Sequence, residues 1–116
     1  MELDRILKHS QQIVVDDLDW ELAARAGLTA SERCVLTYFA DIEAQTIVYL
    51  RDLLRTEAAL EPEVMGFLSI WNYEEYFHGR ALSRLLAACG CGPEKDRVAR
   101  VRAAARPAEA IQALLG

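Results

Sequence analysis

Residues 71–82 read W-N-Y-E-E-Y-F-H-G-R-A-L and lie in the middle of residues 62–90, a segment that otherwise has the pattern of a buried helix. Positions spaced by four and three residues form one seam along this helix: Val64, Leu68, Trp71, Glu75, His78, Leu82, Leu85 and Cys89. Such a seam is typical of a helix that packs against a neighbour in a bundle. Glu75 and His78 interrupt it. Because burying an unpaired carboxylate costs free energy, the seam predicts a partner for these two side chains.

The helix before this one has a matching seam. It consists of Leu36, Phe39, Glu43, Thr46, Leu50, Leu53 and Glu57. Thr29 and Glu32 have the spacing of a capping box, which predicts that this helix starts there and runs to about Ala59. The next helix starts at Glu61-Pro62, since proline suits the first helical turn. The short link near residue 60 predicts an antiparallel hairpin.

The hairpin places the polar seam residues at one height. Glu43 lies about 17 residues before the turn, and Glu75 and His78 lie about 14 and 17 residues after it, at a rise of ~1.5 Å per residue. We therefore expect the three side chains to lie within roughly one helical turn of each other. Two seams interrupted by ligand-type residues at the same level indicate a shared site.

The remaining chain also has a helical pattern. A first helix is expected over about Leu3 to Ala26, ending at Gly27. A basic, alanine-rich helix is expected over about Pro93 to Arg106, followed by a short apolar stretch after Pro107. No segment alternates with the period of a strand for long enough to form one. The sequence predicts an all-α chain with a single domain over residues 1–116.

Composition excludes several classes of function. At 116 residues, with 53% hydrophobic and 27% charged residues, the chain has the composition of one globular domain. A net charge of −5 without a Lys/Arg cluster argues against nucleic-acid binding. Its apolar runs are far shorter than the ~20 residues of a membrane span. The acidic first twenty residues do not resemble a signal peptide, so a cytoplasmic protein is expected.

The three cysteines do not complete a recognisable site. An odd number argues against a disulfide framework. Cys89 and Cys91 form a C-x-C pair that could bind a soft metal, but no second thiol pair or nearby histidine accompanies it. The preferred interpretation is a helix end with reduced thiols.

A carboxylate-bridged metal centre would explain the polar residues of the two seams. Ferritin-like di-iron sites take one Glu from each of two helices and a Glu-x-x-His from each of the other two. Carboxylates with a little imidazole suit iron, with manganese as the other possibility. Glu43 and Glu75 would neutralise one divalent cation, and His78 would be a neutral ligand. The alternative is structural: Glu43 pairs with an arginine, and His78 bonds to a carbonyl.

Two segments resemble a known family. W-N-Y-E-E-Y-F-H-G-R-A-L-S-R-L-L resembles the W-x-x-E-E-x-x-H-G-x-x-L helix of acyl-carrier-protein desaturases. Y-F-A-D-I-E-A-Q-T-I-V-Y-L-R-D-L-L resembles the first ligand helix of that family, so that the resemblance covers about residues 31–90. It implies a ferritin-like hairpin, half of a four-helix bundle, with Glu43 as a terminal or bridging carboxylate, Glu75 as the bridging glutamate and His78 as a ligand. It also implies an oxygen-activating oxidoreductase with an electron donor and an acyl or other small-molecule substrate.

The chain departs from that family in one respect. A complete site needs a second Glu and a second Glu-x-x-His, and neither is present. Either the chain is the amino-terminal half of a longer protein, or two copies pair to supply four glutamates and two histidines. The apolar seams exceed what one hairpin can cover, which favours a homodimer or higher oligomer. Other functions open at this point are iron oxidation or storage, and a helical interaction module with a relict site.

Overall fold

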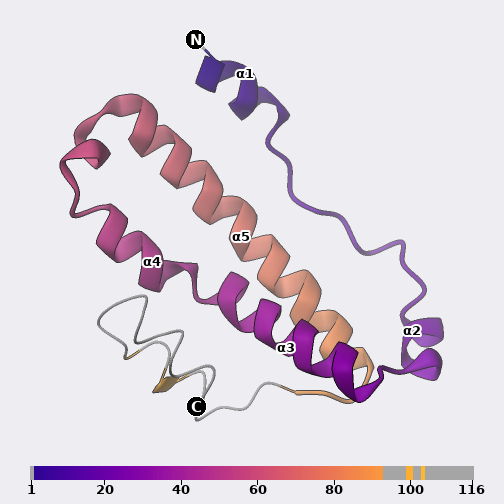
Figure 1. Ribbon diagram of the computed structural model, residues 1–116. Coiled ribbons are helices and arrows are strands. Elements are labelled where there is room, and N and C mark those ends of the chain that lie inside the picture. Colours follow the sequence, from indigo (N-terminus) through magenta and orange to yellow (C-terminus); the bar gives the residue numbers. More distant parts are fainter. Residues whose placement is uncertain (1, 93–98, 101–102, 104–116) are drawn as a thin grey trace.

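The computed structural model describes residues 2–92, 99–100 and 103. The named elements of this part are all helical, which confirms the all-α class (Figure 1). They are α1 (Glu2–His9), α2 (Trp20–Ala26), α3 (Ala30–Ala44), α4 (Thr46–Leu53), the 3₁₀ helix η1 (Glu57–Leu60) and α5 (Pro62–Ala88). The helix expected over residues 93–106 and the stretch after residue 107 lie outside the described residues, apart from 99–100 and 103. None of the described helices is long and apolar enough to cross a bilayer.

The framework of the fold is a hairpin. The chain reverses at η1, and α3 and α4 lie alongside the long helix α5 (Figure 1). Pro62 occupies the first turn of α5, as predicted, and Gly90 follows its end with a positive φ of 75°. The capping box of α3 is also present, since the Thr29 hydroxyl accepts from the Glu32 N–H and the Glu32 carboxylate accepts from the Thr29 N–H.

The expectation of one helix from residue 29 to about residue 59 is wrong. The helix breaks at Gln45, whose φ of −112° and ψ of 24° lie outside the helical region. The Thr46 hydroxyl donates to the Glu43 carbonyl at 2.9 Å, and Ile47 and Val48 follow it. A β-branched run and a hydroxyl that bonds to a preceding carbonyl both weaken a continuous helix. The break therefore comes two residues after Glu43.

The expected helix from residue 3 to residue 26 is also interrupted. α1 ends at His9, and α2 begins only at Trp20. Residues 13–15 are all β-branched, and the Asp19 side chain accepts from the Leu22 N–H at 2.8 Å and so caps a new helix. We call residues 10–19 the N-terminal strap.

The strap is tied to α5. The Ser10 hydroxyl donates to Glu74 at 2.7 Å, and Arg84 forms an ion pair with Asp16 at 2.8 Å. The Arg84 guanidinium also lies over the Trp20 ring, 4.3 Å from its centroid. Strap and α2 therefore contact one side of α5, while α3 and α4 contact another (Figure 1).

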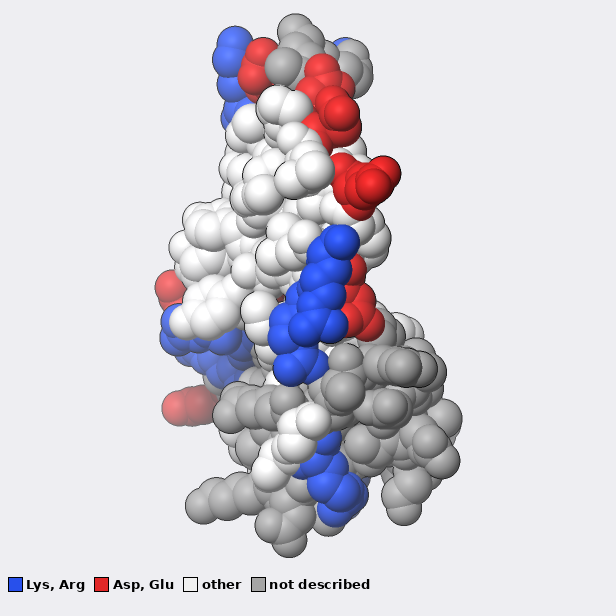
Figure 2. All heavy atoms as spheres, turned by 90° about the vertical axis from the view of Figure 1, so that its left-hand side faces the viewer, with Lys and Arg blue, Asp and Glu red and all other residues white. Residues whose placement is uncertain are grey.

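The buried core is small. The buried apolar residues of the described part are Ala40, Val48, Leu50, Ala59, Leu68 and Leu86. Many larger apolar side chains stay exposed, among them Phe39, Leu53 and Phe67. Figure 2 shows uncharged side chains over much of the face that carries the hairpin turn. The expectation that a single hairpin leaves part of its apolar surface uncovered agrees with this arrangement.

α3 and α5 approach most closely at Gly79 and Ala44. A Cβ atom built on the buried Gly79 would lie 3.0 Å from both the N and the Cα of Ala44. These are backbone atoms, so they cannot move aside as the end of a flexible side chain could. Glycine at position 79 thus allows the two helix backbones to touch.

We predict that Gly79→Ala destabilises the protein. Overpacking costs about 1–3 kcal/mol, and the better helix propensity of alanine returns about 0.5–1 kcal/mol. The central values leave a net loss of roughly 1 kcal/mol, measured by urea unfolding. Ser83→Ala, at an exposed position one turn further along α5, should stay within about 0.5 kcal/mol of wild type. Equal midpoints for Gly79→Ala and wild type would contradict the close approach.

Candidate metal centre

Three ligand-type side chains meet between α3 and α5. Glu43 is the next-to-last residue of α3, and Glu75 and His78 lie one turn apart on α5. His78 Nδ1 lies 3.3 Å from Glu43 Oε2 and 3.8 Å from Glu75 Oε2. One ligand atom from each residue lies within 4.8 Å of the others. The structure thus brings together the three residues that the seams singled out, while their role as metal ligands stays a prediction.

The two carboxylates are more buried than the imidazole. The side chains of Glu43 and Glu75 are 24% and 17% exposed, and that of His78 is 42% exposed. Glu43 Oε2 is completely buried and has no hydrogen-bond partner, although His78 Nδ1 lies nearby. A buried carboxylate oxygen without a partner is costly. A cation between Glu43, Glu75 and His78 would satisfy this oxygen.

The proton affinity of Glu75 reflects the same crowding. Burial, followed by the neighbouring Glu43 carboxylate, raises the pKa of Glu75 from 4.5 to about 7. His78 and Trp71 act in the opposite direction and reduce this shift. Two carboxylates that share a buried position favour protonation of one of them when no cation is present. The pair therefore has the electrostatic character of a cation site.

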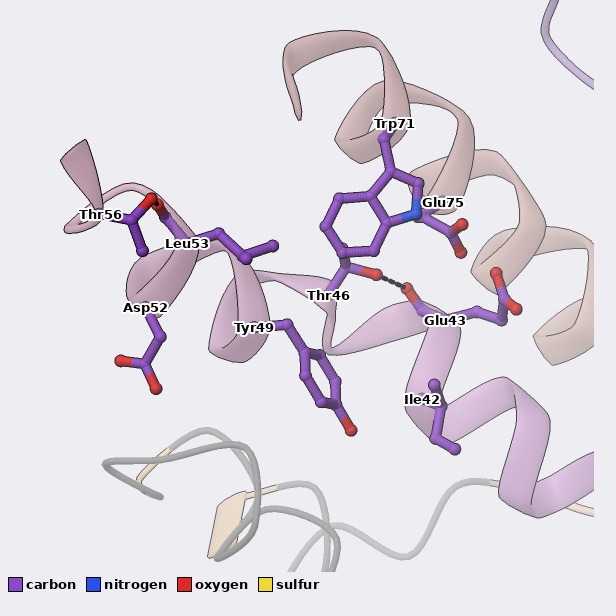
Figure 3. A pocket seen from close by; sticks show the side chains of 9 residues that line it. All are labelled: Ile42, Glu43, Thr46, Tyr49, Asp52, Leu53, Thr56, Trp71 and Glu75. Carbon is purple, nitrogen blue, oxygen red and sulfur yellow. Dashed lines mark hydrogen bonds between the residues drawn. The ribbon is translucent and has the colours of Figure 1, made fainter. Parts of the chain in front are cut away.

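A pocket adjoins the carboxylates. It has a volume of about 580 Å³, and Figure 3 shows Glu43 and Glu75 at one end and Leu53 and Thr56 at the other. Its lining is mainly apolar and comprises Ile42, Glu43, Thr46, Tyr49, Asp52, Leu53, Thr56, Trp71 and Glu75. Such a pocket with a few polar groups is the usual form of a small-molecule site.

Sequence reasoning missed part of this pocket. Ile42 and Tyr49 do not belong to the seam of α3 and α4, but they lie beside it. Ile42 lies near the end of α3, and residues 46, 49 and 53 follow at spacings of three and four on one face of α4. The position of Tyr49 between Thr46 and Leu53, which both belong to the seam, is the signal that could have identified this part of the pocket.

The donor set fits a hard or borderline divalent metal. Two carboxylates and one imidazole suit iron or manganese better than metals that prefer thiolates. In the part of the chain that the structure describes, this is the one group of three or more candidate ligands within binding distance. The thiols lie elsewhere: Cys34 is exposed, and the Cys89 and Cys91 thiols donate to backbone carbonyls. The ion-pair neighbour of Glu43 is His78, which weakens the alternative of an arginine partner.

Comparisons with models of protein families, with curated proteins and with solved structures found no match to this chain. The case for a function therefore rests on the residues and their geometry.

The raised pKa of Glu75 predicts a pH dependence of stability in metal-free protein. Between pH 4.5 and about 7 the folded state retains a proton that the unfolded state has lost. The free energy of unfolding should therefore fall as the pH rises through this window and level off above it. Glu75→Gln should lack this contribution and exceed wild type in stability at pH 8.

Urea unfolding with a chelator at pH 5, 6, 7 and 8 measures this difference. Glu63→Gln, in the exposed first turn of the same helix, is the control and should keep the wild-type pH dependence. Parallel pH profiles for wild type and Glu75→Gln would show that Glu75 titrates normally.

Proposed function

We propose that this chain is a metal-binding protein of the ferritin-like di-iron carboxylate type, with Glu43, Glu75 and His78 as ligands. The observation that carries the proposal is the convergence of their ligand atoms within 4.8 Å around a buried oxygen of Glu43 that accepts no hydrogen bond. Iron is the metal that we propose first, and manganese is the alternative that the same donors accept.

Charge and ligand number make this group half of a two-metal centre. Glu43 and Glu75 balance one divalent cation, and a neutral His78 adds a ligand without adding charge. Ferritin-like centres use twice this set, four glutamates and two histidines around two metals. A second copy of the chain could supply the other half, and so could further residues of a longer protein.

When bound, a di-iron centre supplies the reduction of dioxygen and the oxidation of a C–H bond. The chain supplies the surroundings. Glu43 and Glu75 hold the charge, while Ile42, Tyr49 and Trp71 provide apolar walls that exclude water and accept an apolar part of a substrate. We therefore propose an oxygen-activating oxidoreductase, in keeping with the resemblance to acyl-carrier-protein desaturases.

The pocket favours an organic substrate over iron as the substrate. A ferroxidase would need an acidic path for incoming ions, and Asp52 is the one carboxylate that this pocket adds to Glu43 and Glu75. Iron oxidation or storage therefore remains the second candidate. A relict site in an interaction module is the third, and it requires that metal has no effect on the protein.

The test is thermal unfolding of wild type and Glu75→Ala, each with and without ferrous iron under anaerobic conditions. A ligand at one hundred times its Kd stabilises the folded state by about 2.7 kcal/mol. In a domain of this size that corresponds to a rise in Tm of about 10 °C or more. Glu75→Ala should lose the rise, because one of three ligands is gone. Without metal it should be at least as stable as wild type, since carboxylate repulsion is relieved.

Glu63→Ala serves as the control, because Glu63 is an exposed acid on the same helix outside the group. It should keep the full response to iron. An unchanged Tm of wild type in ferrous iron, together with no metal retained in elemental analysis, would overturn the proposal. If iron instead stabilised wild type and Glu75→Ala equally, its site would lie elsewhere.

A further inference from the structure

The candidate ligands lie at the border of an apolar surface that is only partly covered, with exposed residues at its two ends and half-buried ones between them. We call Phe39, Ile42, Tyr49, Leu53 and Trp71 the open face. Four of these residues line the pocket that contains Glu43 and Glu75, and Phe39 lies one turn before Glu43 on α3. Phe39 is 48% exposed, and the Leu53 side chain at the far end of the pocket is exposed as well. Exposed apolar surface that adjoins a polar site marks a place where another surface docks.

The ligand group supplies too few ligands for a metal of this kind. Glu43, Glu75 and His78 provide three protein ligands, whereas iron and manganese in carboxylate sites take about six donors. A two-fold interface is self-complementary, so a second copy that packs its open face against the first, with the axis beside the ligand group, brings its own three residues next to the first set. One occupant, a second copy of this chain, therefore supplies both the missing ligands and the missing apolar contacts.

The charge of the carboxylates determines under which conditions two copies associate. Two open faces together bring four carboxylates into one buried space, and like charges at close range oppose the association. Two divalent cations cancel those four charges, while the histidines add none. The apolar contacts favour pairing with or without metal, but the charge repulsion that opposes pairing is cancelled when metal binds.

We propose that the open face docks a second copy of this chain and that metal binding at Glu43, Glu75 and His78 drives the pairing. This inference rests on the proposed function for its metal site and adds the partner and its control. Because linkage is reciprocal, metal tightens the dimer by the same factor by which pairing tightens metal binding.

Sedimentation velocity of the full-length chain over a range of concentrations tests the proposal, with manganese(II) as the probe and a chelator as the metal-free condition. We expect the dimer Kd to fall at least tenfold when manganese(II) is added, with one metal retained per chain. The electron paramagnetic resonance signal should show two coupled manganese ions, a signature that an isolated site cannot give.

Phe39→Ser is the variant that separates docking from ligation, because Phe39 is not a ligand. It should weaken the manganese-loaded dimer at least tenfold. Tyr73→Ser is the matched control: Tyr73 is 47% exposed and, like Phe39, has one edge-on aromatic neighbour in its own helix, but it lies outside the open face. Its dimer Kd should equal that of wild type. Leu53→Ser repeats the test at the other end of the pocket if circular dichroism shows Phe39→Ser to be unfolded.

The outcomes distinguish the two proposals. Manganese or iron that binds without changing the sedimentation overturns the inference and leaves the proposed metal function standing; the open face is then covered by the chain itself or by another protein. An equally tight dimer in chelator overturns the linkage. Failure of both metals to bind overturns the proposed function, and the inference with it.

Discussion

The contact between Gly79 and Ala44 is the constraint on which the candidate site depends. Each of these residues directly follows a candidate ligand, so the separation of the two backbones sets the separation of His78 and Glu43. A larger residue at position 79 would move α3 and α5 apart and take the carboxylate away from the imidazole. Gly79 thus positions the preceding residue, His78, next to Glu43.

The burial of Glu43 and Glu75 side by side lowers the stability of the hairpin. Glu43 and Glu75 lie close together with little access to water, and one oxygen of Glu43 accepts no hydrogen bond. The helix that carries Glu43 also breaks two residues later, and Thr46 binds the Glu43 carbonyl there. A small core has to offset these terms. Several destabilising features at one position are typical of a functional site. Apolar residues of similar size would stabilise the same helix contact better than buried carboxylates do.

The sequence predicted the fold where local signals agreed and failed where they competed. The start of α3 and both ends of α5 follow from a capping box, a proline and a terminal glycine. The meeting of Glu43 with His78 could be predicted because the helical rise from the turn gives the height of each side chain approximately, and the break at Gln45 leaves Glu43 within reach of His78. The break at Gln45 could not, because the apolar period continues through it while the β-branched run opposes it. The ferritin-like identity of the hairpin, a bound metal and a reaction stay predictions, because the helices and side chains of one chain do not test them.

The exposed apolar surface of the isolated hairpin lies next to its incomplete group of candidate ligands. One of these features is energetic, the apolar surface around Phe39 and Leu53 that the buried core leaves uncovered. The other is chemical: in the proposed metal site, Glu43, Glu75 and His78 are fewer ligands than an octahedral metal takes. The exposed apolar surface and the incomplete ligand group are made by different residues. The geometry of a helical hairpin does not require that they lie next to each other. Since the pocket joins Leu53 to Glu43 and Glu75, a surface that covers this apolar region also lies beside the carboxylates, where positive charge or a metal is favourable.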